Sequence, residues 1–550
     1  MKYITSQLVK DHVRRCTTAL LTLLSTIAAA QAPAQTNTQH ISEAEYGLNA
    51  AVLMRKSVAN APLHHARVSR AFGSMTPAER KAAIDAYWGR GPSTEVKLSI
   101  FDKFWNYVDT KFAAFQGIDV DWPALRARYR PEIAAGVSRG RFAAIMNHLS
   151  LALRDSHTIP LDLLVNVFTV PEPGVPLLGV SAWEFDTSGA CLTAQDDGSA
   201  LVYSALPNHP LGLQPGDRIL GYEGRPWREL YQELLKEEMP LWPLWWGTSP
   251  TSFEHTFVMS AGLNWHLFDT MDIAKFGSGQ VVHVPTSLMP GVIFWGFCSE
   301  QMDIPGVPKP TYFGNNFNDF VRSGIVQGTN IGYIYVWAWG PSTADDFAAA
   351  VDQLTQVDHV EGLIVDFRFN TGGFLTAPFR GLGALSSHPI PTVSMDERLT
   401  ASDHFPMKSI FPPSQFKLDF DKGVGSTHRV KTSYEGPVAI LVGPGAVSAG
   451  DFGSYWAASL AQVRTFGKSS SMAVGLPTQP ALGTQLDLGP DWEATVAETN
   501  TYRVGAPQDF LIHTEFPVNE RVWLTPEDVA AGRDTVAAAA LGWLQQQIGH

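Results

Sequence analysis

The sequence predicts an α/β core, an N-terminal helical region before it, and an inserted β domain between the two. Two aliphatic runs, 362–369 and 438–443, each lead into a Gly-containing turn, as buried strands of a parallel sheet do. Apolar residues recur at helical spacing over 101–115. From 172 to 245, short β-prone runs alternate with Gly, Asp and Pro. At about 150 residues per domain, a chain of 550 residues corresponds to three to four domains.

Composition and charge exclude several classes of function. The formal net charge is −13, so the chain has no overall basic footprint and we expect no nucleic-acid partner. Three Cys are too few for a disulfide scaffold and form no CxxC pair for structural zinc. The His residues show no metal-ligand spacing. We therefore expect neither a metal nor a cofactor.

Residues 1–34 have the pattern of a signal peptide. Four basic residues precede an apolar run over 17–30, which is too short to span a bilayer as a helix, and small residues follow it. The alternative is an ordinary buried N-terminal helix. We expect export to the periplasm or the exterior, with no stable membrane span after cleavage. The mature chain would keep Cys191 and Cys298, and the sequence leaves open whether they pair.

The first predicted domain, 35–165, is helical. The run 101–115 places six large apolar side chains at helical spacing, and a second helix is predicted over 140–153. That helix ends in the polar string RDSHT, 154–158. In isolation, the His157 of this string reads as a capping or surface group.

The next domain, 172–245, is predicted to be rich in β-strands. Strands are expected over 177–185 and 200–206, and the run LGLQPGDRILGYEGRPW, 211–227, contains two turns around a short strand. The following stretch, 246–330, has weak periodicity and many Trp, Phe, Gly and Pro residues. We expect it to be an irregular, aromatic-rich connection.

The last domain, 331–550, is the predicted α/β core. Besides the two buried strands, a strand is expected over 331–339 and a helix over 344–354. A further helix is predicted to begin near Ser448, and the final helix to run from about 525 to 547.

Ser448 stands where a nucleophile could be exposed. It follows a strand and a tight turn and precedes a helix, whose first N–H groups could stabilise an anion. The same position is also typical of a helix cap. On the other buried strand, Asp366 and Arg368 are expected to form a structural ion pair that braces the turn after it.

Three motifs resemble those of the S41 serine peptidases, a family that includes tail-specific processing proteases and tricorn core proteases. GLIVDFRFNTGGF resembles the family's hydrophobic-Asp-x-Arg-x-Asn-x-Gly-Gly signature, and LVGPGAVSAGDF resembles its nucleophile segment. RDSHT resembles the LxDxHT segment, and the run 211–227 resembles the closing half of a PDZ domain. The resemblance covers about 95–550 and favours the tricorn-like branch. It implies a ClpP/crotonase-like α/β core with an inserted PDZ-like domain.

The resemblance implies specific roles for residues of this chain. Ser448 would be the nucleophile and His157 the base, with the oxyanion held by the N–H of Ala449 and that of Gly372 or Gly373. The third member of the triad is expected to be Glu520, with Glu498 and Glu515 as alternatives, and in a Ser–Lys dyad Lys468 would replace His157 as the base. All four of these candidate residues follow Ser448 in the sequence.

The function predicted from the sequence is that of an exported serine peptidase acting on peptides or proteins. In the PDZ resemblance, Leu178, Gly179 and Val180 would hold the terminal carboxylate of a substrate. Two alternatives remain open: a catalytically idle binding protein on the same fold, and an esterase or amidase that uses the same triad. The sequence does not indicate an oligomeric state.

Overall fold

The computed structural model describes residues 71–549, apart from several internal stretches. These stretches are 181–186, 244–245, 294–297, 311–319, 341, 387–392, 401–402, 412–432, 478–485, 504–505 and 507–508. The predicted signal peptide, 1–34, lies outside the described residues, as does most of the strand expected over 177–185. None of the described helices is long and apolar enough to cross a bilayer.

The described part of the N-terminal region, from residue 71, contains four α-helices, in agreement with the helical pattern of the sequence. They are α3 (Pro77–Trp88), α4 (Thr94–Lys111), α5 (Trp122–Ala135) and α6 (Arg139–Leu153). Each begins at a side-chain cap, and the caps are Thr76, Ser93, Asp121 and Ser138. The helix expected over 101–115 begins earlier and ends at Lys111, whereas the one expected over 140–153 is confirmed within one residue.

A six-stranded sheet forms the core of the second half of the chain, with the order β10-β11-β12-β15-β16-β20. The first pair is antiparallel and the other four pairs are parallel. The strands are β10 (Val321–Ile325), β11 (Ile331–Val336), β12 (Gly362–Asp366), β15 (Val438–Val442), β16 (Val463–Gly467) and β20 (Glu520–Arg521). This sheet confirms the predicted α/β core.

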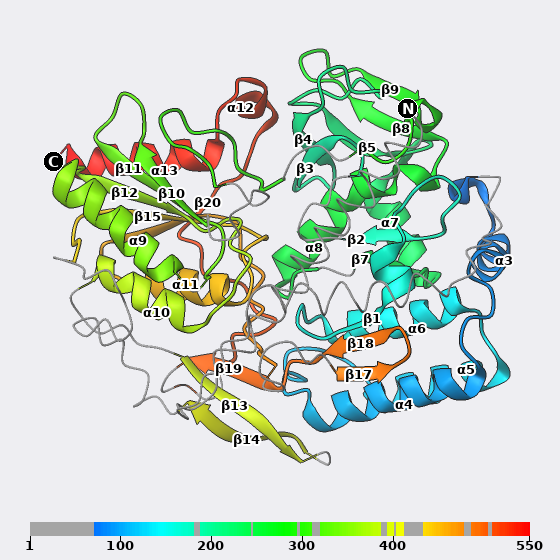
Figure 1. The fold of residues 1–550 in the computed structure, drawn as a ribbon. Coiled ribbons are helices and arrows are strands. Elements are labelled where there is room, and N and C mark those ends of the chain that lie inside the picture. The colour runs from blue at the N-terminus through cyan, green and yellow to red at the C-terminus, as the bar shows by residue number, and fades with distance from the viewer. Residues whose placement is uncertain are drawn as a thin grey trace.

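Helices cover both faces of the central sheet (Figure 1). On one face lies α13 (Thr535–Ile548), and on the other lie α9 (Thr343–Asp352), α10 (Thr376–Gly381) and α11 (Ala449–Ala457). Alternate strand residues point to opposite faces, so Tyr333 and Ile334 belong to different apolar clusters. The single final helix predicted from about 525 to 547 was wrong: α12 (Pro526–Ala530) ends before α13, because Gly532 has φ +70° and Asp534 caps a new helix.

A second sheet precedes the core and corrects the expectation for 246–330. Its order is β3-β4-β5-β8-β9, with β6 beside β5. Its strands are β3 (Ala190–Ala194), β4 (Ala200–Ala205), β5 (Arg218–Tyr222), β6 (Arg225–Pro226), β8 (Thr270–Ala274) and β9 (Val281–Pro285). Helices α7 (Trp227–Lys236) and α8 (Pro250–Met259) and the 3-10 helix η4 (Ser260–Leu267) are associated with it. Much of 246–330 is therefore regular, and its strand β8 pairs with β5 across the intervening helices.

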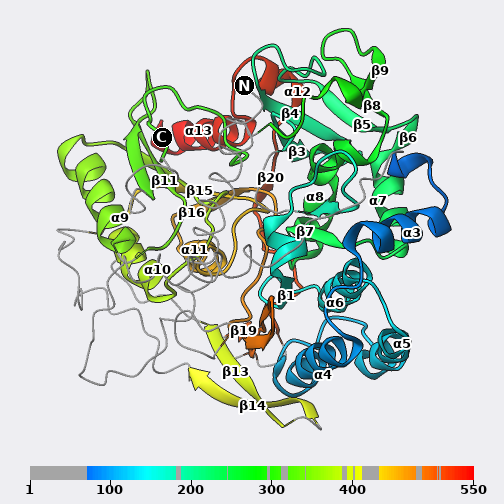
Figure 2. The same cartoon turned by 45° about the vertical axis from the view of Figure 1, so that its right-hand side comes forward.

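Three smaller sheets join distant parts of the chain. The first contains β1 (Ile159–Asp162), β18 (Trp492–Thr495) and β17 (Leu486–Gly489), and the second contains β14 (Asp403–Phe411), β13 (Val393–Thr400) and β19 (Thr499–Arg503). The third pairs β2 (Leu178–Val180) with β7 (Leu241–Pro243). Because β1 follows α6 directly, its pairing with β18 brings the helical region against the C-terminal half. Figure 2 shows β1 and β19 between the N-terminal helices and the core.

A disulfide joins Cys191 on β3 to Cys298, with a Cα–Cα distance of 5.3 Å. The pairing that the sequence left open is therefore present. The residues that follow Cys298 contact the central sheet, because Trp337 Nε1 donates to Gln301 Oε1 at 2.9 Å. The disulfide thus connects the second sheet to a segment held by the core.

Candidate active site

Ser448 lies at the carboxyl end of β15, as the N-cap residue of α11. Its backbone has φ 58° and ψ −122°, a conformation that is strained for any residue except Gly. Its side chain is buried. A strained serine on a strand–turn–helix connection is typical of a hydrolase nucleophile.

The turn after the neighbouring strand β12 contacts Ser448. Gly372 has φ +90°, and a Cβ placed there would lie 2.8 Å from Ser448 Cβ. The turn and the nucleophile segment are also joined by the backbone, because Val447 N–H donates to Asn370 O at 2.9 Å. Only a residue without a side chain allows this close approach.

Two N–H groups beside Ser448 remain available for an oxyanion. Gly372 N–H donates to Asn370 Oδ1 at 3.1 Å, so this group is occupied. The N–H groups of Gly373 and Ala449, in contrast, have no hydrogen-bond partner among the described residues. Ala449 is the first residue of α11, where the N–H groups have no acceptor within the helix. Of the two glycines considered from the sequence, Gly373 is therefore the one whose N–H group has no partner among the described residues.

His157 is buried, unlike the surface group that its sequence context suggests. It follows α6 through Arg154, which has φ 48°, and its N–H donates to Asp155 Oδ1 at 2.6 Å. Burial lowers the pKa of His157 to about 4, and the backbone of Gly475 opposes this shift. Neither ring nitrogen has a hydrogen-bond partner among the described residues, so His157 does not bond to Ser448 in this structure.

One residue, Ser471, links the His157 and Ser448 segments. Its N–H donates to Ala446 O at 2.9 Å, two residues before Ser448. Its hydroxyl lies 3.3 Å from that of Ser156, the residue before His157. The structure therefore brings the two predicted catalytic residues into one neighbourhood, although they are far apart in the sequence.

None of the three candidate carboxylates for the triad bonds to the His157 ring, although Glu498 follows Ala497, whose N–H donates to Thr158 Oγ1 at 3.0 Å beside His157. Glu520 is partly exposed on β20, where Arg464 lies 3.3 Å from its Oε2. Glu498 accepts a hydrogen bond from Tyr107 Oη at 2.5 Å, and Glu515 accepts from Thr251. None of the three is among the groups that shift the pKa of His157.

Lys468 is buried and bonded to groups outside the Ser448 neighbourhood. Its Nζ lies 3.1 Å from Ala194 O and 3.1 Å from Asp196 Oδ1, both near the β3–β4 turn of the second sheet. Burial lowers the pKa of Lys468, while Asp196 opposes this shift. These contacts place Lys468 at the junction between the two sheets.

The structure corrects the expectation for Leu178, Gly179 and Val180. These residues form β2, which is buried and paired with β7. The Gly179 N–H donates to Asn264 Oδ1 at 2.8 Å, and Gly179 O accepts from Asn264 Nδ2 at 3.0 Å. Because η4 and β7 occupy these backbone groups, the segment has no free edge to bind a terminal carboxylate.

The predicted Asp366–Arg368 ion pair is confirmed, with Nη2 and Oδ2 2.7 Å apart and both side chains buried. The sequence analysis missed its third member: Asp534, the N-cap of α13, lies 2.9 Å from Arg368 Nη2. The group braces β12 against α13 and makes no contact with Ser448.

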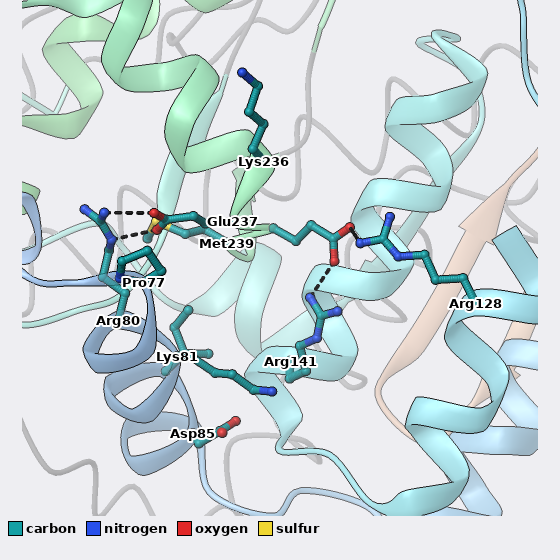
Figure 3. A pocket seen from close by; sticks show the side chains of 11 residues that line it. Pro77, Arg80, Lys81, Asp85, Arg128, Arg141, Lys236, Glu237 and Met239 are labelled. Carbon is teal, nitrogen blue, oxygen red and sulfur yellow. Dashed lines mark hydrogen bonds and ion pairs between the residues drawn. The ribbon is translucent and has the colours of Figure 1, made fainter.

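A cavity of about 290 Å³ lies away from this site, between α3, α6 and the end of α7 (Figure 3). Its charged side chains are largely paired with one another, as in the contact of Arg141 with Glu238 at 2.8 Å. Among the described residues, no group of His, Cys, Asp and Glu side chains is arranged to hold a metal ion.

Sequence reasoning missed two further residues of the site. Asn370 holds the turn after β12 through the contacts given above. Asp451 accepts the Ser448 N–H at 2.9 Å and is fully buried. The spacing Ser448-x-x-Asp451 is that of a capping box, and this signal could have identified Asp451.

Two stretches of the chain match models of known peptidase families. Residues 330–486 match the model described as Peptidase family S41, and residues 94–150 match the model described as Tricorn protease C1 domain. A stretch of 79 residues is 36% identical to the carboxy-terminal processing protease CtpB of Bacillus subtilis (strain 168). That match covers 14% of this chain and 16% of CtpB, so the chain matches only a small part of that relative's length.

Solved structures of mature CPAF resemble the chain over most of its length. One has a TM-score of 0.54 at 13% identity and covers 82% of this chain and 96% of that chain. Another, of mature CPAF complexed with lactacystin, has a TM-score of 0.53 at 12% identity and covers 82% and 97%. At this level of identity, the likeness shows a shared fold.

Proposed function

Because residues 330–486 match the model of peptidase family S41, we propose that the chain is a serine-type peptidase of this family in which Ser448 is the nucleophile and His157 the base. The observation that carries the proposal is the strained Ser448, which meets the Gly372 turn and is followed by Ala449. The N–H groups of Ala449 and of Gly373 in that turn have no hydrogen-bond partner among the described residues. A tetrahedral oxyanion formed by attack on a carbonyl would accept hydrogen bonds from both.

The protonation state of His157 is compatible with a role as the base, and its lowered pKa makes the imidazole a weaker proton acceptor than that of an ordinary His. With a pKa of about 4, its imidazole is neutral at pH 7 and can accept the Ser448 proton during attack. The Ser448–His157 hydrogen bond would form when a substrate enters, because catalytic hydrogen bonds are often long in the free enzyme. The protonated His157 would then give this proton to the leaving amine, whose C–N bond breaks to leave Ser448 acylated. Water would attack the acyl-enzyme while the neutral His157 accepts a proton from it, and this proton would return to Ser448 Oγ as the acid product leaves.

The proposal assigns no role in the chemistry to Glu520 or Lys468. Glu520 is bonded to Arg464, and Lys468 to Asp196 and Ala194 O. The structure also offers no support for capture of substrate C-termini at β2. We therefore propose an endopeptidase or processing activity on peptides and proteins, without C-terminal capture at that strand.

We also propose that the protein acts outside the cytoplasm. The Cys191–Cys298 disulfide supports export, because such bonds persist in oxidising compartments. The signal-like pattern of 1–34 agrees with this location. The substrates would then be exported peptides or proteins.

The test compares the mature protein with Ser448→Ala and with Ser454→Ala as a matched control. Ser454 is a buried serine of the same helix, whose hydroxyl donates to Gly450 O at 2.8 Å. Each protein is incubated with an unfolded protein and with a serine-directed fluorophosphonate, and new termini and labelled peptides are identified by mass spectrometry. We expect cleavage and labelling at Ser448 in the wild type and the control, and neither in Ser448→Ala. Cleavage by Ser448→Ala, or an unlabelled wild type, would contradict the proposal.

A further inference from the structure

Two fully buried carboxylates, Asp451 and Asp155, contact the two proposed catalytic residues through the backbone. Asp451 accepts the N–H of Ser448, and Asp155 accepts the N–H of His157. Neither carboxylate bonds to the His157 ring, so neither occupies the position of a triad carboxylate. Burying a carboxylate is costly, and a site that keeps two of them needs a reason for both.

Asp451 holds two strained loops together. Its Oδ2 accepts the Ser448 N–H at 2.9 Å and the Ala473 N–H at 2.8 Å, and its Oδ1 accepts the Met472 N–H at 2.8 Å. Ser448 has φ 58° and Met472 has φ 51°. Strain of this kind persists only where surrounding contacts enforce it. Asp451 supplies such contacts to both residues.

The loop held by Asp451 leads to His157. Two residues beyond Ala473 is Gly475, whose backbone acts on the His157 ring. Asp451 therefore fixes the Ser448 segment relative to the loop that packs against His157. A shift of this loop would change the distance between the nucleophile and the base.

Asp155 does for the backbone of His157 what Asp451 does for the backbone of Ser448. It follows Arg154, which has φ 48°, and closes the turn that carries His157 with a 2.6 Å hydrogen bond. The Thr158 N–H donates to Asp155 O at 3.3 Å in the same turn. The orientation of the His157 side chain relative to the backbone thus depends on Asp155.

We propose that Asp155 and Asp451 are positioning residues, each of which fixes the backbone of one catalytic residue so that Ser448 and His157 meet. This inference rests on the proposed function. Burial raises the pKa of both carboxyls to about 7, which agrees with sites that keep an acidic group at some cost to stability. Neither residue contacts the substrate in this proposal; both act through Ser448 and His157.

The test uses Asp451→Ala and Asp155→Ala, with Asp162→Ala as the matched control. Asp162 is also a fully buried carboxylate in the N-terminal half; it accepts the Leu164 N–H at 2.9 Å and is paired with Arg139, and it contacts neither catalytic residue. The readouts are the rate constant for fluorophosphonate labelling of Ser448, and kcat and KM for a peptide that the wild type cleaves. Circular dichroism checks that each full-length variant is folded.

We expect labelling and kcat to fall by about 100-fold in Asp451→Ala and Asp155→Ala, because a catalytic group displaced by about 1 Å loses about that much rate. KM should change little, and Asp162→Ala should stay within about threefold of the wild type. The isosteric variants Asp451→Asn and Asp155→Asn keep one acceptor oxygen, so their rates should lie between those of the Ala variants and the wild type. A purely structural role would lower stability without this split between kcat and KM.

Folded Ala variants that label at wild-type rates, or that fall no further than Asp162→Ala, would overturn the proposal. If the Ala variants do not fold, the Asn variants decide: a fall of at least about threefold supports it, and wild-type rates overturn it. An unlabelled wild type is a different result, because it refutes the proposed function itself.

Discussion

At the scale of single residues, the site depends on what surrounds each titratable side chain. His157 and Lys468 are both buried, and burial lowers the pKa of each. They differ in their partners. Lys468 is bonded to Asp196 and to Ala194 O, whereas neither ring nitrogen of His157 has a well-formed hydrogen bond to a described residue and only the backbone of Gly475 raises its pKa. A base must be free to accept a proton from the nucleophile, and His157 meets this condition.

The first prediction separates the two candidate bases. His157→Ala should lower the rate of fluorophosphonate labelling at Ser448 by at least about 100-fold, since general-base catalysis contributes about 10²–10⁴-fold. Lys468→Met, which keeps a long apolar side chain at the junction of the two sheets, should label within about threefold of the wild type. The reverse result, a silent Lys468→Met and an active His157→Ala, would establish a Ser–Lys dyad instead.

The second prediction concerns the pH dependence of stability. Burial raises the pKa of Asp451 to about 7 from an ordinary value near 4, so between these values the folded protein binds more protons than the unfolded chain. The contribution of Asp451 to stability therefore falls as the pH rises from 4 to 7, and the penalty is complete above pH 7. Because Asn does not titrate, the Tm of Asp451→Asn minus that of the wild type should increase by at least about 2 °C between pH 5 and pH 8. Thermal melts that give the same difference at both pH values would show that Asp451 is ionised at low cost.

At the scale of elements, the turn after β12 shows how strand ends build the site. The parallel pairing of β12 with β15 places the carboxyl ends of both strands at one edge. Gly372 at one end and Ser448 at the other then come into contact. This arrangement follows from sheet topology, and a sequence pattern alone does not give the distance.

The third prediction tests this close contact. Gly372→Ala adds a Cβ 2.8 Å from that of Ser448, at a backbone with φ +90°. Gly89→Ala is the matched control, because Gly89 also has positive φ, +60°, but nothing lies within 4 Å of its added Cβ. We expect Gly372→Ala to lose at least about 100-fold in labelling of Ser448. Gly89→Ala should lose only a small part of its stability and keep its labelling rate, as measured by denaturant unfolding and fluorophosphonate kinetics. Equal labelling in the two folded variants would count against the contact.

Helices and strands could be predicted from the sequence where one or both of their faces consist of apolar side chains. The helix α6 and the buried strands β12 and β15 follow directly from their runs of apolar residues. The strands β8 and β9 could not be predicted in this way. Strand β9 lies at the edge of its sheet with alternate residues exposed, and the surrounding sequence is rich in Trp and Pro, so no continuous apolar run marks it. The sequence therefore predicted that a β domain begins near residue 172, but not that its strands continue beyond residue 245.

The same limit applies to the site. Motif order predicted Ser448, His157 and the glycine turn, because these residues occupy strand ends and loops with a recognisable spacing. The partners of Glu520 and Lys468 could not be predicted, since each is bonded to a residue far away in the sequence or in another sheet. Long-range pairing of charges depends on the packing of whole elements, which local patterns do not encode.

At the scale of the whole molecule, the central and second sheets are joined by covalent and ionic contacts. Cys191 on β3 is bonded to Cys298, 107 residues later. Just beyond Cys298, Glu300 O accepts from Arg368 Nη1 at 3.4 Å, and Met302 N–H donates to Asp534 Oδ2 at 3.0 Å. The disulfide therefore ties the second sheet to the buried ion group that braces β12 and α13.

The fourth prediction follows from this connection. The double variant Cys191→Ala/Cys298→Ala should lose about 2–5 kcal/mol of unfolding free energy, because the unfolded chain regains the freedom of a loop of about 100 residues. Urea unfolding measures the loss, and dithiothreitol should destabilise the wild type while leaving the variant unchanged. The loss of stability should be largest in the connection between the two sheets. Limited proteolysis should therefore cut the variant first between β9 and β10, where the second sheet leads into the core. An unfolding midpoint that neither reduction nor substitution changes would mean that the contacts of Arg368 and Asp534 hold this segment without the covalent link.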